Sequence, residues 1–256
     1  MIKLVKITLT GANGKMGKVI ASVVSERSDC KIISGIDHNT TPNDIFPIYY
    51  EPKELTENPD VIIDFSHPSA LDDLIEYGLS TGTPIVFATT GYSDEQINKI
   101  KKAAEQIPVF FTFNMSLGIN LLIKLAKTAT EILGGQFDIE VVEKHHNQKI
   151  DAPSGTAIML ANSINEVLDN NCHYIYDRHS QRKKRENSEI GIHSIRGGTI
   201  VGEHDVIFAG RDEVITLSHS AASKEVFAVG AVNAAVFLAT QKPGIYDMAA
   251  LLDNKN

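Results

Sequence analysis

The chain has 256 residues, of which 43% are hydrophobic and 22% charged, and its formal net charge is -8. This length is enough for one large α/β domain or two smaller ones, and the composition is that of a globular protein rather than a disordered one. The negative charge argues against general nucleic-acid binding, and no apolar run reaches the roughly 20 residues that span a bilayer. We therefore expect a cytoplasmic protein.

The N-terminal segment combines lysines with apolar residues and so resembles the start of a signal peptide. No small-residue cleavage site follows, and the alternation over residues 5–10 favours a β-strand. The two cysteines, Cys30 and Cys172, lie far apart and outside any metal-binding spacing, so we expect reduced thiols.

The first half of the chain alternates short apolar runs with helical patterns, which is typical of a doubly wound parallel sheet of the Rossmann-like α/β class. The predicted helix over Ser93–Gln106 opens with a capping box formed by Ser93 and Gln96. The predicted strands are Val5–Thr10, Lys31–Ile36, Val61–Phe65, Ile85–Ala88 and Val109–Thr112, and the predicted helices are Lys15–Glu26, Ser69–Ser80 and Ser93–Gln106.

A glycine-rich turn joins the first predicted strand to the first predicted helix. Glycines permit close approach of main-chain amides to a pyrophosphate, and the helix N-terminus adds partial positive charge. The spacing is GxxGxxG rather than GxGxxG, so a tight turn without a ligand stays an alternative. The candidate dinucleotide-binding residues here are Gly11, Ala12, Asn13, Gly14, Lys15, Met16 and Gly17.

Asp37 closes the second predicted strand, twenty residues after Gly17. An acidic side chain at this spacing accepts hydrogen bonds from the adenosine ribose hydroxyls and disfavours the extra phosphate of NADP. His38 follows, and a partly protonated imidazole tolerates that phosphate. We therefore expect NADH or NADPH as cofactor, with NADH favoured and dual use open.

After about Asn114 the pattern changes to one helix and a series of strands without crossover helices. These features predict a second, α+β domain built on a mixed sheet. A final helix over Phe227–Ala239 is apolar enough to pack back onto the first domain. The expected division is residues 1–114 plus 226–256 for the dinucleotide and 115–225 for substrate binding and oligomerisation. The elements expected after Asn114 are a helix at Ile119–Leu133 and strands at 137–142, Ile190–Ile195, Thr199–Phe208 and Glu213–His219.

The most distinctive segment is Glu143–Thr156, EKHHNQKIDAPSGT, which connects a predicted strand to an amphipathic helix. Helix-start amides at Gly155 and Thr156 suit a carboxylate, Lys149 supplies a cation, and either His145 or His146 can act as a general acid. A polar structural loop is the alternative. A metal site is disfavoured, because no third ligand has a suitable spacing and a lysine adjoins the histidines.

Taken together, the motifs resemble the 4-hydroxy-tetrahydrodipicolinate reductase (dihydrodipicolinate reductase) family of the diaminopimelate route to lysine. The resemblance runs through nearly the whole chain, and HHxxKxDAPSGT is its most specific string. The matching segments are GANGKMG at 11–17, DFSHP at 64–68, ATTG at 88–91, NMSLGIN at 114–120, EKHHNQKIDAPSGTA at 143–157 and IRGGTIVGEH at 195–204.

The resemblance implies reduction of a cyclic dicarboxylate by hydride transfer from NAD(P)H, in a homotetramer formed through the sheet of the second domain. It makes His145 the acid/base residue and Lys149 a second donor and carboxylate partner, and it assigns His146, Gly155 and Thr156 to substrate binding. Further cofactor contacts that it implies are Ala88, Thr89, Thr90, Thr112, Phe113, Asn114 and Met115.

Two positions depart from the family pattern. Ala88 replaces a common glycine near the nicotinamide, and His38 stands where some members place arginine for the 2′-phosphate. The basic run Arg182–Arg185 matches no motif, so we expect a solvated loop, with a role near an anionic ligand as the alternative. Two rival functions are another two-domain dehydrogenase and a non-catalytic dinucleotide sensor. The first gives no account of HHxxKxDAPSGT, and the second predicts binding without turnover.

Overall fold

A computed structural model describes residues 4–254, which divide into two compact units. Unit 1 contains the chain up to Leu117 together with the segment from Glu225 onward, and unit 2 contains Gly118–Lys224. Within residues 4–254, no helix has both the length and the apolar character needed to cross a membrane.

Unit 1 is built on a seven-stranded sheet in which every pairing is parallel. Its strands are β1 (Val5–Thr10), β2 (Cys30–Ile36), β3 (Ile48–Tyr49), β4 (Val61–Asp64), β5 (Ile85–Phe87), β6 (Pro108–Phe111) and β12 (Gly244–Tyr246). The spatial order is β12-β6-β5-β4-β1-β2-β3, so the direction of winding reverses between β1 and β4. In such sheets ligands bind beyond the carboxyl ends of the strands at this reversal.

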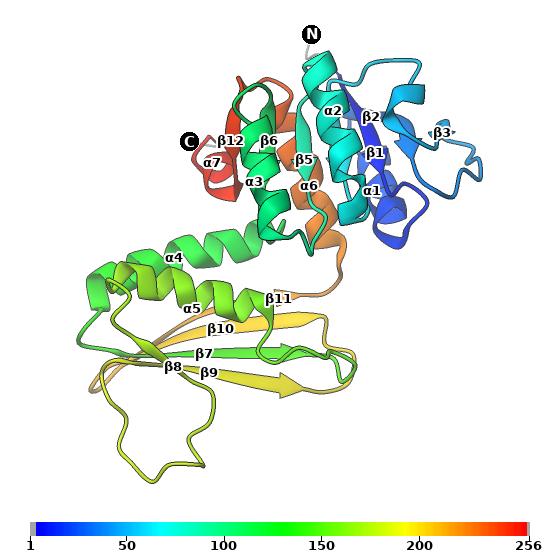
Figure 1. The fold of residues 1–256 in the computed structure, drawn as a ribbon. Coiled ribbons are helices and arrows are strands. Elements are labelled where there is room, and N and C mark those ends of the chain that lie inside the picture. Colours follow the sequence, from blue (N-terminus) through cyan, green and yellow to red (C-terminus); the bar gives the residue numbers. More distant parts are fainter. Residues whose placement is uncertain (1–3, 255–256) are drawn as a thin grey trace. The chain divides into compact units, whose positions relative to one another are not determined.

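Helices cover both faces of this sheet (Figure 1). One hydrophobic cluster joins α1 (Lys15–Ser25), α6 (Glu225–Leu238) and α7 (Met248–Asp253), and another joins α2 (Leu71–Thr81) and α3 (Asp94–Ala103). Short 3-10 turns, η1 and η2, lie at Pro52–Glu54 and Pro68–Ala70. The expected packing of α6 onto the first domain is confirmed, because α6 buries Ala231, Val232 and Ala235 against β4, β5 and α1.

Unit 2 places α4 (Leu117–Leu133) and α5 (Gly155–Val167) on one face of a five-stranded sheet (Figure 1). The strands are β7 (Asp138–His145), β8 (His173–Ile175), β9 (Glu189–Arg196), β10 (Gly202–Ala209) and β11 (Val214–Ala221). In the order β11-β10-β7-β9-β8, β7 pairs parallel with β9 and antiparallel with β10. The expected mixed sheet is therefore confirmed.

The strands β3, β8 and β12 and the helix α7 were not predicted, but the difference that matters most for the site is the length of β7. This strand continues to His145, past the predicted end at Val142, and its residues alternate between half-buried and buried throughout. Glu143 and His145 therefore occupy buried positions on one face, while Lys144 lies on the other. The prediction stopped too early because a charged residue at a buried position reads as the end of a strand.

Candidate active site

The glycine turn of unit 1 has no room for a side chain at Gly11 or Gly17. Gly11 has a φ of +70°, and a Cβ there would lie 2.3 Å from the carbonyl oxygen of Phe65. A Cβ on Gly17 would lie 2.2 Å from the carbonyl oxygen of Gly11. Gly14 stands at the N-cap of α1 with no side chain to bond the first-turn amides. The turn thus exposes a helix N-terminus of the kind that binds phosphate.

Asp37, directly after β2, is held by both of its carboxylate oxygens. Oδ2 accepts a hydrogen bond from the Asn13 amide at 3.0 Å, and Oδ1 accepts one from the Asn39 amide at 2.9 Å. The Asn13 side chain in turn donates to the carbonyl oxygens of Asn39 and Thr41. Each carboxylate oxygen keeps a further lone pair. Asp37 is therefore oriented by the glycine turn and can still accept from ribose hydroxyls.

A cavity of about 340 Å³ lies at this edge of the unit 1 sheet. Four predicted cofactor residues line it: Gly11, Gly14, Asp37 and His38. The other residues that line this cavity were not predicted. Most of them lie in segments without a motif, and the rest belong to DFSHP at 64–68, a family string to which no cofactor role was assigned. These are Thr10, Ile36, Tyr50, Glu51, Pro52, Phe65, Ser66, His67, Ser69, Ala70, Asp73 and Leu74.

The other predicted cofactor residues lie outside this cavity. Ala12, Asn13, Lys15, Met16 and Gly17 belong to the glycine turn and the start of α1. The segments 88–90 and 112–115 follow β5 and β6; in the same parallel sheet β5 neighbours β4, and β6 is the next strand beyond β5. Ala88 belongs to the hydrophobic cluster of α1 and α6. Its departure from glycine therefore places a methyl group among core side chains.

Asp64, at the end of β4, joins three of the segments at this sheet edge. It is fully buried and accepts hydrogen bonds from the hydroxyls of Thr10 at 2.5 Å, Ser66 at 2.5 Å and Tyr92 at 2.8 Å. Burial raises the pKa of Tyr92, so this phenol stays a donor. The Ser66 amide donates to the Thr89 hydroxyl at 2.8 Å. The turns after β1, β4 and β5 are therefore held in one arrangement.

In unit 2, His145 lies at the end of β7 with its ring 11% exposed. Its Nδ1 lies 2.6 Å from Oε2 of Glu143, which is fully buried. Arg196 at the end of β9 donates to both oxygens of the same carboxylate, at 2.7 Å each. Burial alone would raise the pKa of Glu143, but the hydrogen bonds from Arg196 and His145 outweigh it and lower the pKa to about 2.

Lys149 and the start of α5 follow His145 within one connection. The Lys149 ammonium pairs with Asp151 at 2.8 Å, and its amide donates to the carbonyl oxygen of His146 at 3.1 Å. Gly155 and Thr156 are the first two residues of α5, directly after its N-cap Ser154. A Cβ on Gly155 would meet nothing within 4 Å, so the space in front of this helix start is open within unit 2.

A second histidine, His204 on β10, lies beside His145 and was not predicted as a site residue. The two rings meet edge to face with centroids 5.3 Å apart, and Nε2 of His204 lies 3.2 Å from Oγ of Ser154. Burial and the neighbouring His145 lower the pKa of His204 to about 4. His204 is therefore neutral at physiological pH. His204 is the last residue of the family string IRGGTIVGEH, but no role was predicted for it.

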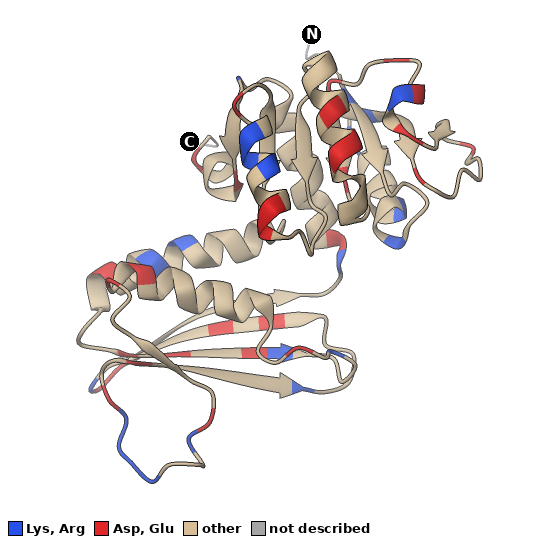
Figure 2. Ribbon diagram, viewed as in Figure 1, with Lys and Arg blue, Asp and Glu red and all other residues tan. Residues whose placement is uncertain are grey.

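The basic run differs in part from the expected solvated loop. Arg182 and Lys184 are exposed, but Arg185 is bound by Asp138 at 2.7 Å and Glu140 at 3.0 Å. Lys183 pairs with Glu186 at 2.9 Å. Figure 2 shows these basic residues on the loop between β8 and β9. Half of the run thus fastens this loop to acidic residues.

Family models for dihydrodipicolinate reductase match both parts of the chain, the N-terminal one over residues 5–115 and the C-terminal one over residues 118–252. The chain belongs to the dihydrodipicolinate reductase family. The 4-hydroxy-tetrahydrodipicolinate reductase of Caldanaerobacter subterraneus subsp. tengcongensis is 52% identical over 97% of this chain and 98% of its own. That of Clostridium tetani is 45% identical over 98% of each chain.

The solved structures agree with this membership. A dipicolinate-bound dihydrodipicolinate reductase from Paenisporosarcina sp. TG-14 superposes with a TM-score of 0.81 at 25% identity, covering 96% of this chain and 98% of that one. A myo-inositol dehydrogenase from Corynebacterium glutamicum has a TM-score of 0.57 at 14% identity, covering 92% and 88%, and shows only a shared fold. The predicted family, fold class and NAD(P)H-dependent reductase activity are thus confirmed. This reductase acts in lysine biosynthesis.

Proposed function

We propose that His145 and Lys149 perform the substrate chemistry of 4-hydroxy-tetrahydrodipicolinate reduction, with unit 1 binding the dinucleotide and unit 2 the substrate. The observation that carries the proposal is the 2.6 Å contact between Nδ1 of His145 and the buried carboxylate of Glu143. A proton on Nδ1 held by this carboxylate leaves Nε2 as the nitrogen that exchanges a proton with a ligand. A family match alone does not provide this orientation.

The residues of unit 1 suit a nicotinamide dinucleotide. The glycine turn brings main-chain amides to the start of α1, and Asp37 offers carboxylate oxygens beside the same turn. NAD(P)H supplies the hydride when bound, and the protein supplies orientation and charge. We assign residues 88–90 and 112–115 to the nicotinamide end on two grounds. They directly follow β5 and β6, and they overlap the family strings ATTG at 88–91 and NMSLGIN at 114–120.

The residues of unit 2 suit the proton transfer and the binding of carboxylates. Reduction places negative charge on the substrate, and His145 neutralises it by donating the proton on Nε2. Lys149 lies four residues beyond His145, and a substrate carboxylate competes with Asp151 for its ammonium. The first amides of α5, at Gly155 and Thr156, receive a carboxylate, with His146 at the same connection. These contacts orient the ring for reaction.

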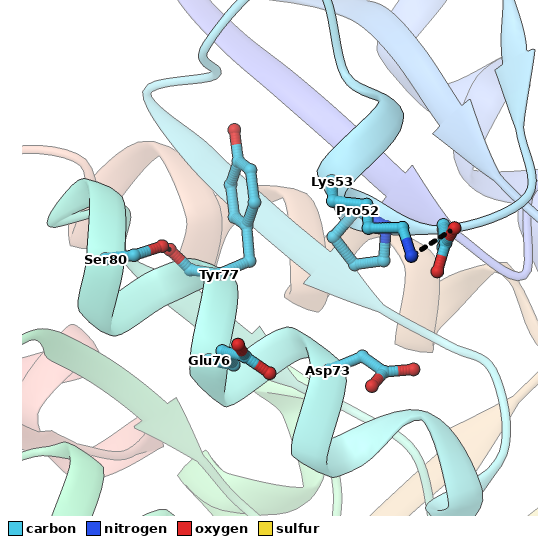
Figure 3. A pocket seen from close by; sticks show the side chains of 7 residues that line it. Pro52, Lys53, Asp73, Glu76, Tyr77 and Ser80 are labelled. Carbon is cyan, nitrogen blue, oxygen red and sulfur yellow. Dashed lines mark hydrogen bonds and ion pairs between the residues drawn. The ribbon is translucent and has the colours of Figure 1, made fainter.

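For the cofactor, we propose a preference for NADH with dual use allowed. The cavity that contains Asp37 is also lined by Glu51 and Asp73, and within residues 4–254 its lining includes no lysine or arginine. A neighbouring cavity of about 270 Å³ shares Glu51 and Asp73 (Figure 3). Its Lys53 is paired with Glu51 at 2.8 Å. Negative charge surrounds the adenosine end, so a 2′-phosphate is disfavoured.

For assembly, we propose the homotetramer that the family resemblance implies, formed through the unit 2 sheet. The helices α4 and α5 lie on one face of this sheet (Figure 1). At its edge, β11 exposes Val214 and Ile215, which suits contact with another copy. Light scattering of the purified protein gives the mass directly, and a monomer at micromolar concentration would contradict the proposal. The place of the reaction in amino-acid biosynthesis supports a cytoplasmic location.

The residue roles are tested by single variants assayed with enzymatically produced 4-hydroxy-tetrahydrodipicolinate, with NADH loss followed by absorbance. His145→Gln should lower kcat by about 100-fold or more, because general acid catalysis contributes on this scale. Lys149→Met should mainly raise the KM for the dicarboxylate. Lys127→Met, which removes an exposed ammonium paired with Glu166 on α5, is the matched control. Wild-type turnover in His145→Gln would refute the assigned acid.

A further inference from the structure

The ion pair between Glu143 and Arg196 is buried at a place where neither residue has an assigned role. The Glu143 side chain is 0% exposed and that of Arg196 is 20% exposed. Burying an ion pair costs desolvation free energy that its attraction often fails to repay, so such a pair is weak evidence for a purely stabilising role. The contacts of this ion pair are with residues of the proposed substrate site in unit 2, which indicates a role in that site.

The pair holds three parts of the candidate site at once. Oε2 of Glu143 meets Nδ1 of His145 at 2.6 Å, and Oε1 accepts the Ser154 amide at 3.1 Å. Arg196 also donates to the carbonyl oxygen of Asp151 at 2.7 Å. The ring of His145, the connection that carries Lys149, and the residue that caps α5 are all attached to one buried carboxylate and its guanidinium.

Each member of the pair has a distinct physical effect on the imidazole. A carboxylate at Nδ1 fixes the ring tautomer and favours the imidazolium form. A guanidinium bound to both oxygens of that carboxylate offsets its negative charge and limits this stabilisation. Removing the carboxylate and removing the guanidinium should therefore change proton release from the ring in opposite directions.

We propose that Glu143 and Arg196 are positioning residues for proton transfer, with Glu143 holding Nδ1 of His145 so that Nε2 carries the transferred proton and Arg196 setting how firmly that proton is held. This inference deepens the proposed function and rests on His145 as the acid. Glu143 is fully buried, so it acts through His145.

The other ionisable groups around His145 enter the same balance. His204 on β10 packs against the ring and is neutral, since its pKa is lowered to about 4. His219 on β11 lies opposite His204 in the antiparallel pairing of β10 with β11. Lys149, on the connection after β7, is paired with Asp151. Only the Glu143 carboxylate forms a hydrogen bond with the ring among the residues that the structure describes.

The pH dependence of kcat tests the proposal with Glu143→Gln and Arg196→Gln. Because the acid must be protonated, kcat falls as pH rises past the point at which it loses its proton. In Glu143→Gln this fall should move to lower pH, and in Arg196→Gln to higher pH, each by about one pH unit or more. Superposed profiles, or shifts in the same direction, would overturn the proposal.

Glu189→Gln is the matched control. Glu189 is equally buried, pairs with Arg178 at 2.7 Å, and lies at the opposite end of β9 from Arg196. Seven residue steps along β9 separate Glu189 from Arg196 by about 23 Å. This variant should lower the melting temperature, as the two test variants also should, but it should not move the pH profile. A profile shift as large as that of Glu143→Gln would show that loss of any buried ion pair produces the effect.

A readout without turnover completes the test and needs no variant. In the wild-type protein, ¹⁵N NMR of the His145 ring at alkaline pH should show the tautomer with the proton on Nδ1, and a proton on Nε2 would overturn the proposal. Two outcomes separate this proposal from the proposed function. If His145 is not the acid, His145→Gln keeps its turnover, although the wild-type ring carries its proton on Nδ1. If only the positioning is wrong, His145→Gln loses turnover, but the wild-type ring carries its proton on Nε2.

Discussion

At the scale of single residues, the carboxylate of Asp37 is held at the end of β2 by the amides of Asn13 and Asn39. His38 beside it is exposed and contacts Tyr50, with the ring centroids 5.2 Å apart and the ring planes tilted by 58°. The spacing from the glycine turn was enough to predict both positions. Tyr50 and Asp73 were not predicted, because Tyr50 lies in a segment without a periodic pattern and Asp73 is an exposed residue of a predicted helix that carries no motif.

This arrangement predicts how cofactor preference can be altered. Asp37→Asn combined with His38→Arg removes the carboxylate charge, keeps an oxygen acceptor for one of the two amides, and adds a guanidinium. The ratio of kcat/KM for NADPH to that for NADH should rise by about tenfold or more, which corresponds to one charge-assisted hydrogen bond. Steady-state kinetics with both cofactors measure the ratio. An unchanged ratio would show that the 2′-phosphate does not reach this part of the cavity.

At the scale of elements, α5 and α3 both begin with a capping serine but in different surroundings. Ser154 accepts from the Ala157 amide, is buried, and contacts His204 at 3.2 Å. Ser93 forms an exposed capping box with Gln96. The capping box was predicted from sequence and is confirmed. The link between Ser154 and His204 was hidden, because fifty residues separate them.

The two serines therefore predict different costs of substitution. Ser93→Ala should destabilise the fold by about 1 kcal/mol, the usual value of an N-cap. Ser154→Ala should cost about 2–3 kcal/mol, because it also leaves a buried imidazole nitrogen without its partner. Urea unfolding of both variants measures the difference. Equal losses would mean that the contact of Ser154 with His204 adds nothing.

The strand β7 shows where prediction from sequence reached its limit. The alternation through Val141 predicted a strand, but Glu143 at the next inward position reads as a break, because a lone buried carboxylate is costly. The compensating charge, Arg196, comes from β9 and is 53 residues away. Such pairing is a property of the sheet register rather than of the local pattern. The histidine was thus found without the residue that orients it.

At the scale of the whole molecule, two buried groups couple stability to pH. Glu143 has its pKa lowered from 4.5 to about 2, so it contributes stability above pH 4.5 that is lost as the pH falls towards 2. His204 has its pKa lowered from 6.5 to about 4, so the unfolded chain binds a proton first as the pH falls. Both effects make the fold less stable in acid.

The His204 effect is expected between pH 6.5 and about 4 and amounts to at most about 3 kcal/mol. His204→Asn should flatten the dependence of the unfolding free energy on pH in this window. His173→Asn changes an exposed histidine at the start of β8 and serves as the control. Urea unfolding between pH 7 and pH 4.5 measures both. A wild-type slope in His204→Asn would assign the acid sensitivity to other groups.

The assignment of chemistry to unit 2 and of cofactor binding to unit 1 is tested most directly by the double variant His145→Ala/Lys149→Ala. NADH affinity is measured by fluorescence titration and turnover by NADH loss with 4-hydroxy-tetrahydrodipicolinate. The expected result is a fall in kcat/KM by about 1,000-fold or more, with the Kd for NADH changed by less than about twofold. Turnover near that of the wild-type protein would contradict the assignment.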